Sequence, residues 1–289
     1  MTLNIDPQKL VFSEFDCLEP PETRWLEERA YWEDYNRMFF QSNGLPYSSA
    51  DSRVDEWLTA TDRAPFAFMA RELLQQLGER TDLSDVDLVL LAHWLPDLHL
   101  GTSVTNFAMQ HLGIDKGFGF AISDRGLSAP LFAMNCAARY LNADRRKAII
   151  MVMDQKHLLY RSPIVDDLKP VNSATIMVLE NDTTSGLTYA GYRRIPSVKK
   201  QDLGAAIQLL CEQFKLRPDK VTLIADPEVI LKVAHAGPTL SQNTQHLCSA
   251  PFAALAQTSD TYEDVLIVSY EDERLSAVCL KAPDERAVG

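Results

Sequence analysis

A turn near residue 125 could place a nucleophile at the start of a helix. The stretch AISDRGLSAPLF, residues 121–132, leaves an apolar strand, passes a charged pair and a glycine, and enters a helix at Ser128. A helix N-terminus favours an anion, so a cysteine or serine placed there is activated for attack on an acyl group. Here Leu127 precedes the helix and has no nucleophilic atom. Ser128 could attack only beside a base, and we expect its hydroxyl to cap the helix.

Two further positions in the second half of the chain could take part in chemistry. Cys248 precedes the small-residue helix SAPFAALAQ, where the helix dipole would favour a thiolate. Only His246 is near it in sequence, so we expect a buried and unreactive thiol. Asp226 follows the apolar run LIA. Its negative charge is unsuited to stabilising an enolate.

Composition and charge limit the classes of partner and cofactor. The 289 residues include 28 basic and 40 acidic side chains, and the formal charge of −12 repels nucleic acid and anionic lipid surfaces. We find no apolar run of about 18 residues and no secretory signal, so we expect a cytoplasmic protein without a membrane segment. The five cysteines lack C-x-x-C spacing, and His93 and His99 have no ligand cluster beside them. We therefore expect reduced thiols, no metal and no cofactor.

Helical and strand patterns alternate from residue 64 to residue 181. Amphipathic spacing predicts helices, and short continuous apolar runs predict strands that are covered on both faces. The predicted helices are 64–78, 101–113 and 128–142, the last of about five turns, and the predicted strands are 86–94, 117–123, 148–154 and 173–181. A loop is expected over 155–172. This order predicts a parallel sheet with helices on both faces.

A similar order of elements follows the break NDTTSG. LTYAGYRRI, KVTLIADP, VLIVSY and LSAVCLKA are predicted strands, whereas DLGAAIQLLCEQFKL, EVILKVAHA and SAPFAALAQ are predicted helices. We therefore expect two halves, residues 1–185 and 186–289.

An aromatic segment near the N-terminus is predicted to be an insertion. It covers residues 20–62, and a helical face is predicted for five of its residues, Trp25, Leu26, Tyr31, Trp32 and Tyr35. We expect this segment to be a packed cap over the core. A partner-binding helix is the alternative.

The order of four motifs resembles the thiolase-like superfamily, in particular ketoacyl synthases of type III. The motifs are DVDLVLLAHWLPD, GTSVTNFAMQHLG, GFGFAIS and KAIIMVMDQ. The resemblance covers residues 64–182 well and the rest loosely. It implies a layered αβαβα fold of two similar halves, with the second half shortened here. It also implies a dimer whose active members condense acyl thioesters with a cysteine, a histidine and an asparagine.

All three of those catalytic positions are altered in this chain. The resemblance places Leu127 at the cysteine, Asp226 or Pro227 at the histidine and Cys248 at the asparagine. Without a thiolate no acyl-enzyme forms, and without the other two groups the enolate is not stabilised. The chain is therefore similar to a non-catalytic subunit of a heterodimeric ketosynthase and resembles the inactive half of the quinolone signal synthase. The matching residues are Ile122, Ser123, Asp124, Leu127, Cys248, Pro251 and Phe252.

The strand before the turn is the expected dimer interface. Its bulky residues alternate with small ones in the order Phe118, Gly119, Phe120, Ala121, Ile122. An uncharged edge strand invites pairing, and the resemblance places this strand at the two-fold axis of the family's dimers. We expect an active ketosynthase subunit to pair here, in a heterodimer or heterotetramer. That partner would then make the contact with acyl-CoA or acyl carrier protein.

Two other functions are kept as alternatives. The first is a stand-alone acyltransferase or thioester hydrolase that uses Ser128 or Cys248. The second is a homodimeric binding protein for an acyl ligand. Covalent acylation would distinguish an enzyme from a silent subunit.

Overall fold

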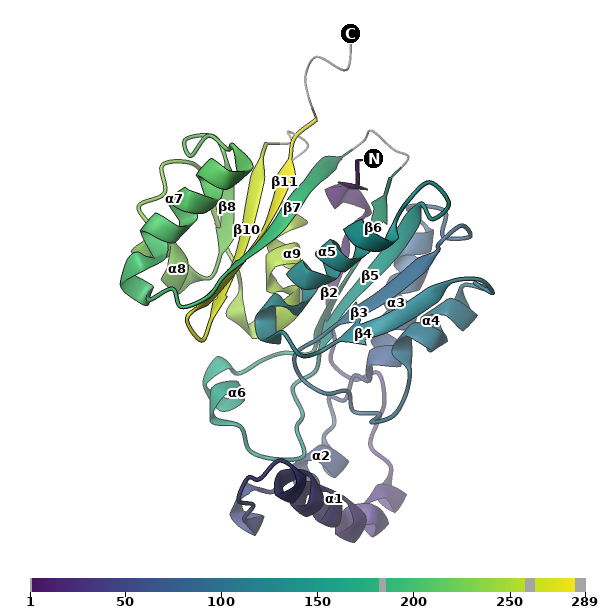
Figure 1. Ribbon diagram of the computed structural model, residues 1–289. Helices are drawn as coiled ribbons and strands as arrows, with labels where there is room; N and C mark the ends of the chain where they lie inside the picture. The colour runs from purple at the N-terminus through teal and green to yellow at the C-terminus, as the bar shows by residue number, and fades with distance from the viewer. Residues whose placement is uncertain (1, 182–185, 258–262, 284–289) are drawn as a thin grey trace.

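Within the described residues, 2–181, 186–257 and 263–283 of the computed structural model, eleven strands form one mixed sheet (Figure 1). They are β1 (Asn4–Ile5), β2 (Val11–Glu14), β3 (Leu88–Ala92), β4 (Phe118–Ile122), β5 (Lys147–Asp154), β6 (Ser173–Glu180), β7 (Leu187–Ile195), β8 (Thr222–Ala225), β9 (Thr239–Ser241), β10 (Val265–Glu271) and β11 (Arg274–Lys281). The order along the sheet is β4-β3-β5-β6-β1-β7-β11-β10-β8-β9, and β2 pairs with β6.

Nine α-helices lie within the described residues, and six of them cover the outer faces of the sheet or fill the space between its two parts. The nine are α1 (Arg29–Ser42), α2 (Val54–Thr59), α3 (Phe66–Gly78), α4 (Val104–His111), α5 (Ala129–Tyr140), α6 (Pro163–Leu168), α7 (Leu203–Phe214), α8 (Pro227–Lys232) and α9 (Ala250–Leu255). α3 and α4 pack outside the first part, α7 and α8 outside the second, and α5 and α9 lie between them (Figure 1). This is the predicted layered αβαβα arrangement.

The side chains of β3 show why the layers form. Leu88, Leu90 and Ala92 belong to the central core with α5 and α9. Val89 and Leu91 point the other way and pack with α3 and α4. A strand that is covered on both faces needs an apolar residue at every position, which the run LVLLA supplies.

Three sequence predictions about these elements are wrong. α5 has 12 residues, or about three turns, instead of the predicted length of about five turns. It ends early because Leu141 already has extended backbone. The expected loop over 155–172 contains α6, which begins at Pro163. β5 and β6 are antiparallel, so the sheet is mixed and not parallel. β1, β2 and β9 were not predicted, since each is very short or pairs only with distant strands.

The N-terminal strand joins the two parts of the sheet. β1 lies between β6 and β7, where Asn4 is opposite Glu180 on one side and Thr188 on the other. The predicted boundary between the halves follows residues 182–185, which lie outside the described residues. The division into residues 1–185 and 186–289 stays a prediction.

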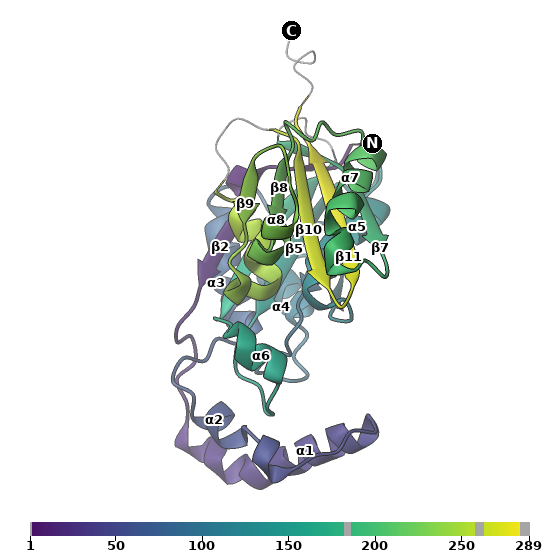
Figure 2. The same ribbon diagram turned by 90° about the vertical axis from the view of Figure 1, so that its left-hand side faces the viewer.

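Residues 20–62, which we call the cap, lie away from the helical layers (Figures 1 and 2). The cap has its own small core, in which Val54, Trp57 and Leu58 pack against Leu98 and Leu159. These last two residues belong to the loops that follow β3 and β5. The cap therefore packs on the loops at one end of the sheet and not on the main cores.

The predicted helical face of the cap is wrong in part. Trp25 and Leu26 precede α1 in a 3-10 turn. On α1 itself, Trp32 packs towards Trp57, whereas Tyr31 is 63% exposed. Asn36 is the one residue of α1 that is fully buried. Part of the apolar surface of α1, at Tyr31 and Met38, therefore faces outwards.

β4 is an edge strand, as the family resemblance implied. Within the described residues it pairs with β3 alone. Phe118 and Phe120 contact Tyr140 of α5, and Phe118 is 51% exposed. Gly119 faces α4, where an added Cβ would lie 3.0 Å from Thr105 Cβ. Pairing of this edge with another chain stays a prediction.

Candidate functional site

Two of the three positions that are predicted to be altered line one very small pocket. Leu127 and Asp226 border a space of about 40 Å³ together with Leu247. Cys248 follows Leu247, and its Sγ lies 3.6 Å from the carbonyl oxygen of Gly126. The fold therefore brings the three predicted positions together. A pocket of this size holds no more than a few water molecules.

Leu127 is part of the packing that closes this site. It contacts a cluster made by loops after β3 and β5, by α6 and by the turn before α9; the buried members are Leu95, Leu158, Val165 and Leu247. Leu247 has a φ of 46°, an unfavourable conformation for a branched residue. Leu127 thus contributes apolar contacts and no reactive group to this site.

The prediction that Ser128 caps α5 is wrong. No side-chain capping hydrogen bond is made by Ser128. Its Oγ donates instead to the carbonyl oxygen of Arg125, at 2.8 Å, and the residue is buried. Pro130 occupies the first turn as expected. A hydroxyl that donates to a backbone carbonyl has no base to remove its proton.

Cys248 has the features of an unreactive thiol. The residue is 0% exposed. Burial raises the pKa of Cys248 well above its usual range, and the nearby Asp154 carboxylate adds to this shift because it repels a thiolate. His246 does not approach the sulfur, since its Nε2 lies 2.7 Å from Glu14 Oε1.

Asp154 organises the site, although the sequence analysis did not select it. It ends β5 and is 0% exposed. Its Oδ1 accepts hydrogen bonds from the backbone N–H groups of Trp94 and Leu95, at 2.9 and 2.8 Å. Its Oδ2 accepts from the N–H of Cys248 at 3.0 Å. Burial raises the pKa of Asp154, opposed by these three hydrogen bonds.

Two other carboxylates hold backbone groups around the small pocket. Glu271 Oε2 accepts from the N–H of Leu127 at 3.0 Å, and burial raises the pKa of Glu271. Gly126 has a φ of +56° and lies so close that an added Cβ would meet this carboxylate. Asp226 caps α8, where its Oδ1 accepts from the N–H of Glu228 at 2.7 Å. All of these carboxylates act as backbone acceptors, which is a structural role.

A much larger cavity lies nearby, between the cap and the ends of β3, β4 and β5. It has a volume of about 260 Å³. A groove of about 420 Å³ adjoins it and runs along β4. The two hollows share His93, Pro96, Asp97 and Leu100. The open space of the molecule at this end of the sheet is therefore beside the altered positions and not among them.

Solved structures of condensing enzymes share this fold. A variant of OleA from Xanthomonas campestris has a TM-score of 0.64 at 12% sequence identity, with 98% of each chain covered. A tetronic acid condensing enzyme has 0.64 at 14% identity, covering 97% of this chain and 100% of the other. The 3-oxoacyl-(acyl carrier protein) synthase III of Xanthomonas oryzae pv. oryzae has 0.63 at 13% identity, covering 98% and 100%. The chain thus has the thiolase-like fold of type III ketosynthases.

Neither a family model nor a curated protein matches the sequence. At 12 to 14% identity the structural likeness establishes the fold and not the activity. In the part of the chain that the structure describes, no helix has both the length and the apolar character to cross a membrane. The same residues contain no group of three potential ligands that could hold a metal ion.

Proposed function

We propose that this chain is a catalytically silent ketosynthase-like subunit that pairs with an active ketosynthase and supports condensation of acyl thioesters. Fatty acid, polyketide and quinolone-type biosynthesis are the settings in which such a pair would act. The observation that carries the proposal is the closed site at the start of α5. Leu127 lies where an active member needs a nucleophile, and the pocket beside it, about 40 Å³, is too small for an acyl chain.

The chemistry of the structural neighbours supports the substrate class. One OleA structure contains bound lauric acid and lauroyl-CoA, and another neighbour is named as a condensing enzyme. In the present chain, Ser128 donates to a backbone carbonyl and Cys248 is fully buried. Neither group favours a stand-alone transferase or hydrolase. The acyl-enzyme would therefore form on the partner.

Exposed apolar residues support pairing on one face. Within the described residues, eleven large hydrophobic side chains are exposed, and eight of them lie on the cap or beside the β4 edge. These eight are Leu26, Tyr31, Tyr35, Met38, Phe39, Leu45, Phe118 and Tyr140. Contiguous exposed apolar surface marks interaction sites. The cavity and the groove connect the cap with β4, so a partner on this face would contact both.

The net charge also favours docking of an acyl carrier protein on the active partner. The chain carries a formal charge of −12. An acyl carrier protein is itself acidic, so it would be repelled here and would dock on the active partner. Such a complex would act in the cytoplasm.

The test is to purify the tagged chain from its own cells, identify the captured proteins and treat the complex with lauroyl-CoA. We expect a thiolase-like ketosynthase with an intact cysteine to co-purify. Intact-mass spectrometry should show acylation of that partner and none of this chain. Acyl mass on Ser128 or Cys248 would contradict the proposal, as would the absence of any ketosynthase.

A matched pair of variants locates the interface. Phe118→Asp places a charge on the exposed edge strand and should reduce the captured ketosynthase at least tenfold. Leu231→Asp makes the same kind of change on α8, where Leu231 is 85% exposed, and should leave capture unchanged. Equal capture by both variants would exclude β4 as the pairing strand.

A further inference from the structure

The cavity beneath the cap is built from the carboxyl ends of three parallel strands and the inner side of α1. His93 and Trp94 follow β3, Ser123 follows β4, and His157 lies in the loop after β5. Tyr35 and Phe39 come from α1. We propose that this cavity binds a small planar aromatic molecule that carries an N–H or O–H hydrogen-bond donor. This inference does not depend on the proposed function.

The walls of the cavity favour a flat apolar ligand. Five aromatic side chains line it, namely Tyr35, Phe39, Trp57, Trp94 and Tyr160. The rings of Phe39 and Tyr160 are stacked, with centroids 5.8 Å apart and an interplanar angle of 19°. Aromatic faces prefer offset stacking or edge contacts with another ring. A volume of about 260 Å³ is close to the lower end of ligand pockets and suits one or two fused rings.

His93 and Asp97 supply acceptor atoms to the lining of the cavity. His93 Nδ1 lies 2.7 Å from the carbonyl oxygen of Leu95, so this nitrogen carries the proton and Nε2 of a neutral ring is an acceptor. Asp97 Oδ1 accepts from the N–H of Phe66 at 2.9 Å. Asp97 Oδ2 is buried and has no hydrogen-bond partner among the described residues. A buried acceptor without a partner is costly, and a donor on a ligand would offset that cost.

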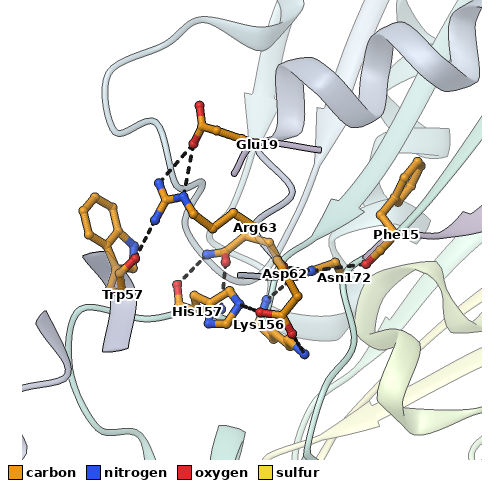
Figure 3. A network of polar contacts seen from close by, with 9 residues as sticks. Phe15, Glu19, Trp57, Asp62, Arg63, Lys156, His157 and Asn172 are labelled. Atoms are coloured by element: carbon orange, nitrogen blue, oxygen red, sulfur yellow. Dashed lines mark hydrogen bonds and ion pairs between the residues drawn. The ribbon is translucent and has the colours of Figure 1, made fainter. Parts of the chain in front are cut away.

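A network of polar contacts holds the cavity in shape (Figure 3). His157 Nε2 lies 2.7 Å from Asp62 Oδ1, which ties the loop after β5 to the cap. Arg63 is 2% exposed, pairs with Glu19 at 3.1 Å and donates to the carbonyl oxygen of Trp57. Trp57 and His157 are thus fixed before a ligand arrives. Such pre-organisation lowers the entropy cost of binding.

Charge excludes acidic ligands from this cavity. Asp97 lines it, and burial raises the pKa of Asp97, opposed by its backbone hydrogen bonds and by the nearby His99. A carboxylate or phosphate on the ligand would be repelled at short range. The ligand is therefore uncharged or cationic, as in an aromatic amine, an indole or a phenol.

The test is calorimetric titration of the purified chain with three probes. Indole carries an N–H donor, 1-methylindole lacks it, and indole-5-carboxylate adds a negative charge. We expect indole to bind, 1-methylindole to bind about tenfold more weakly, and the carboxylate not to bind. Equal affinity for indole and 1-methylindole, or no binding of indole, would overturn the proposal.

Variants assign the binding to the cavity. Phe39→Ala removes one aromatic wall and should weaken the binding of indole about tenfold. Met38→Ala changes the adjacent and more exposed position of α1 and should leave the affinity for indole unchanged. Asp97→Asn should weaken the binding of indole but leave the affinity for 1-methylindole unchanged, because only indole donates a hydrogen bond. Thermal unfolding checks that each variant is folded. Unchanged indole affinity in Phe39→Ala would place the ligand elsewhere and refute the assignment.

Discussion

The closed site around Leu127 and the cavity beneath the cap lie at the same end of the same sheet, yet one is filled and the other is open. Their volumes are about 40 and 260 Å³. Leucine side chains from three loops meet in the first. Aromatic side chains are held apart in the second by the contacts of Arg63 and His157. The difference between the two regions is one of packing: apolar side chains fill the first, whereas the second keeps space where polar contacts hold its walls.

Asp154 connects the two regions, so its removal should have the largest effect. The N–H of Trp94, which lines the cavity, and the N–H of Cys248, which borders the closed site, both bind its carboxylate. Asp154→Ala leaves three buried backbone donors without partners, and we expect a loss of about 3 kcal/mol or more in the free energy of unfolding. Urea unfolding measures it.

Asp154→Asn is the control for that loss. The amide keeps an acceptor for Trp94 and Leu95 and loses only the contact with Cys248, so the cost should be about half as large. If alanine and asparagine were equally mild, Asp154 would not hold the two regions together.

Restoring a thiol at the closed site should have a smaller effect. Leu127→Cys removes apolar contacts with Leu158 and Leu247 and should cost about 1–2 kcal/mol, because Leu127 is only half-buried. The new cysteine should not be acylated, because the pocket of about 40 Å³ has no room for an acyl chain. Intact-mass spectrometry after incubation with lauroyl-CoA checks this. Stoichiometric acylation of the new cysteine would show that the site is still open to substrate.

The smallest expected effect is a pH dependence at Glu271. Burial raises the folded-state pKa of Glu271, so the folded chain binds a proton more tightly there than the unfolded chain. The corresponding stability is present below the ordinary pKa of about 4.3 and is lost as the pH rises through the folded value. Glu271→Gln keeps an acceptor for the N–H of Leu127 but removes the group that binds the proton. Compared with it, wild type should gain less than about 1 kcal/mol between pH 7 and pH 5 in urea unfolding.

Local patterns were enough to predict the main strands and the bulky and small faces of β4, whereas its edge position followed from the family resemblance. Phe118 and Phe120 alternate with small residues, and each face of a strand has one environment. The grouping of Leu127, Asp226 and Cys248 also followed from the family resemblance. These features depend on neighbouring residues or on the fold as a whole.

The role of Asp154 and the cavity could not be predicted, because both depend on distant contacts. Asp154 has the sequence of an ordinary strand end, and its partners are 60 and 94 residues away. An aspartate that ends a fully apolar run was the only signal. The capping prediction for Ser128 failed because a 3-10 turn precedes α5 and brings the hydroxyl to Arg125. A serine at the start of a helix can thus be assigned as a cap only when the backbone before that helix is known.

β1 is synthesised much earlier than both strands with which it pairs, β6 and β7. A ribosome releases Asn4 and Ile5 long before their neighbours Leu187 and Thr188. β1 can therefore pair with β7 only after residues 187–188 have been synthesised. Such long-range closure is slow. A bulky fusion directly before residue 4 would delay this step, whereas a carboxyl-terminal fusion would not.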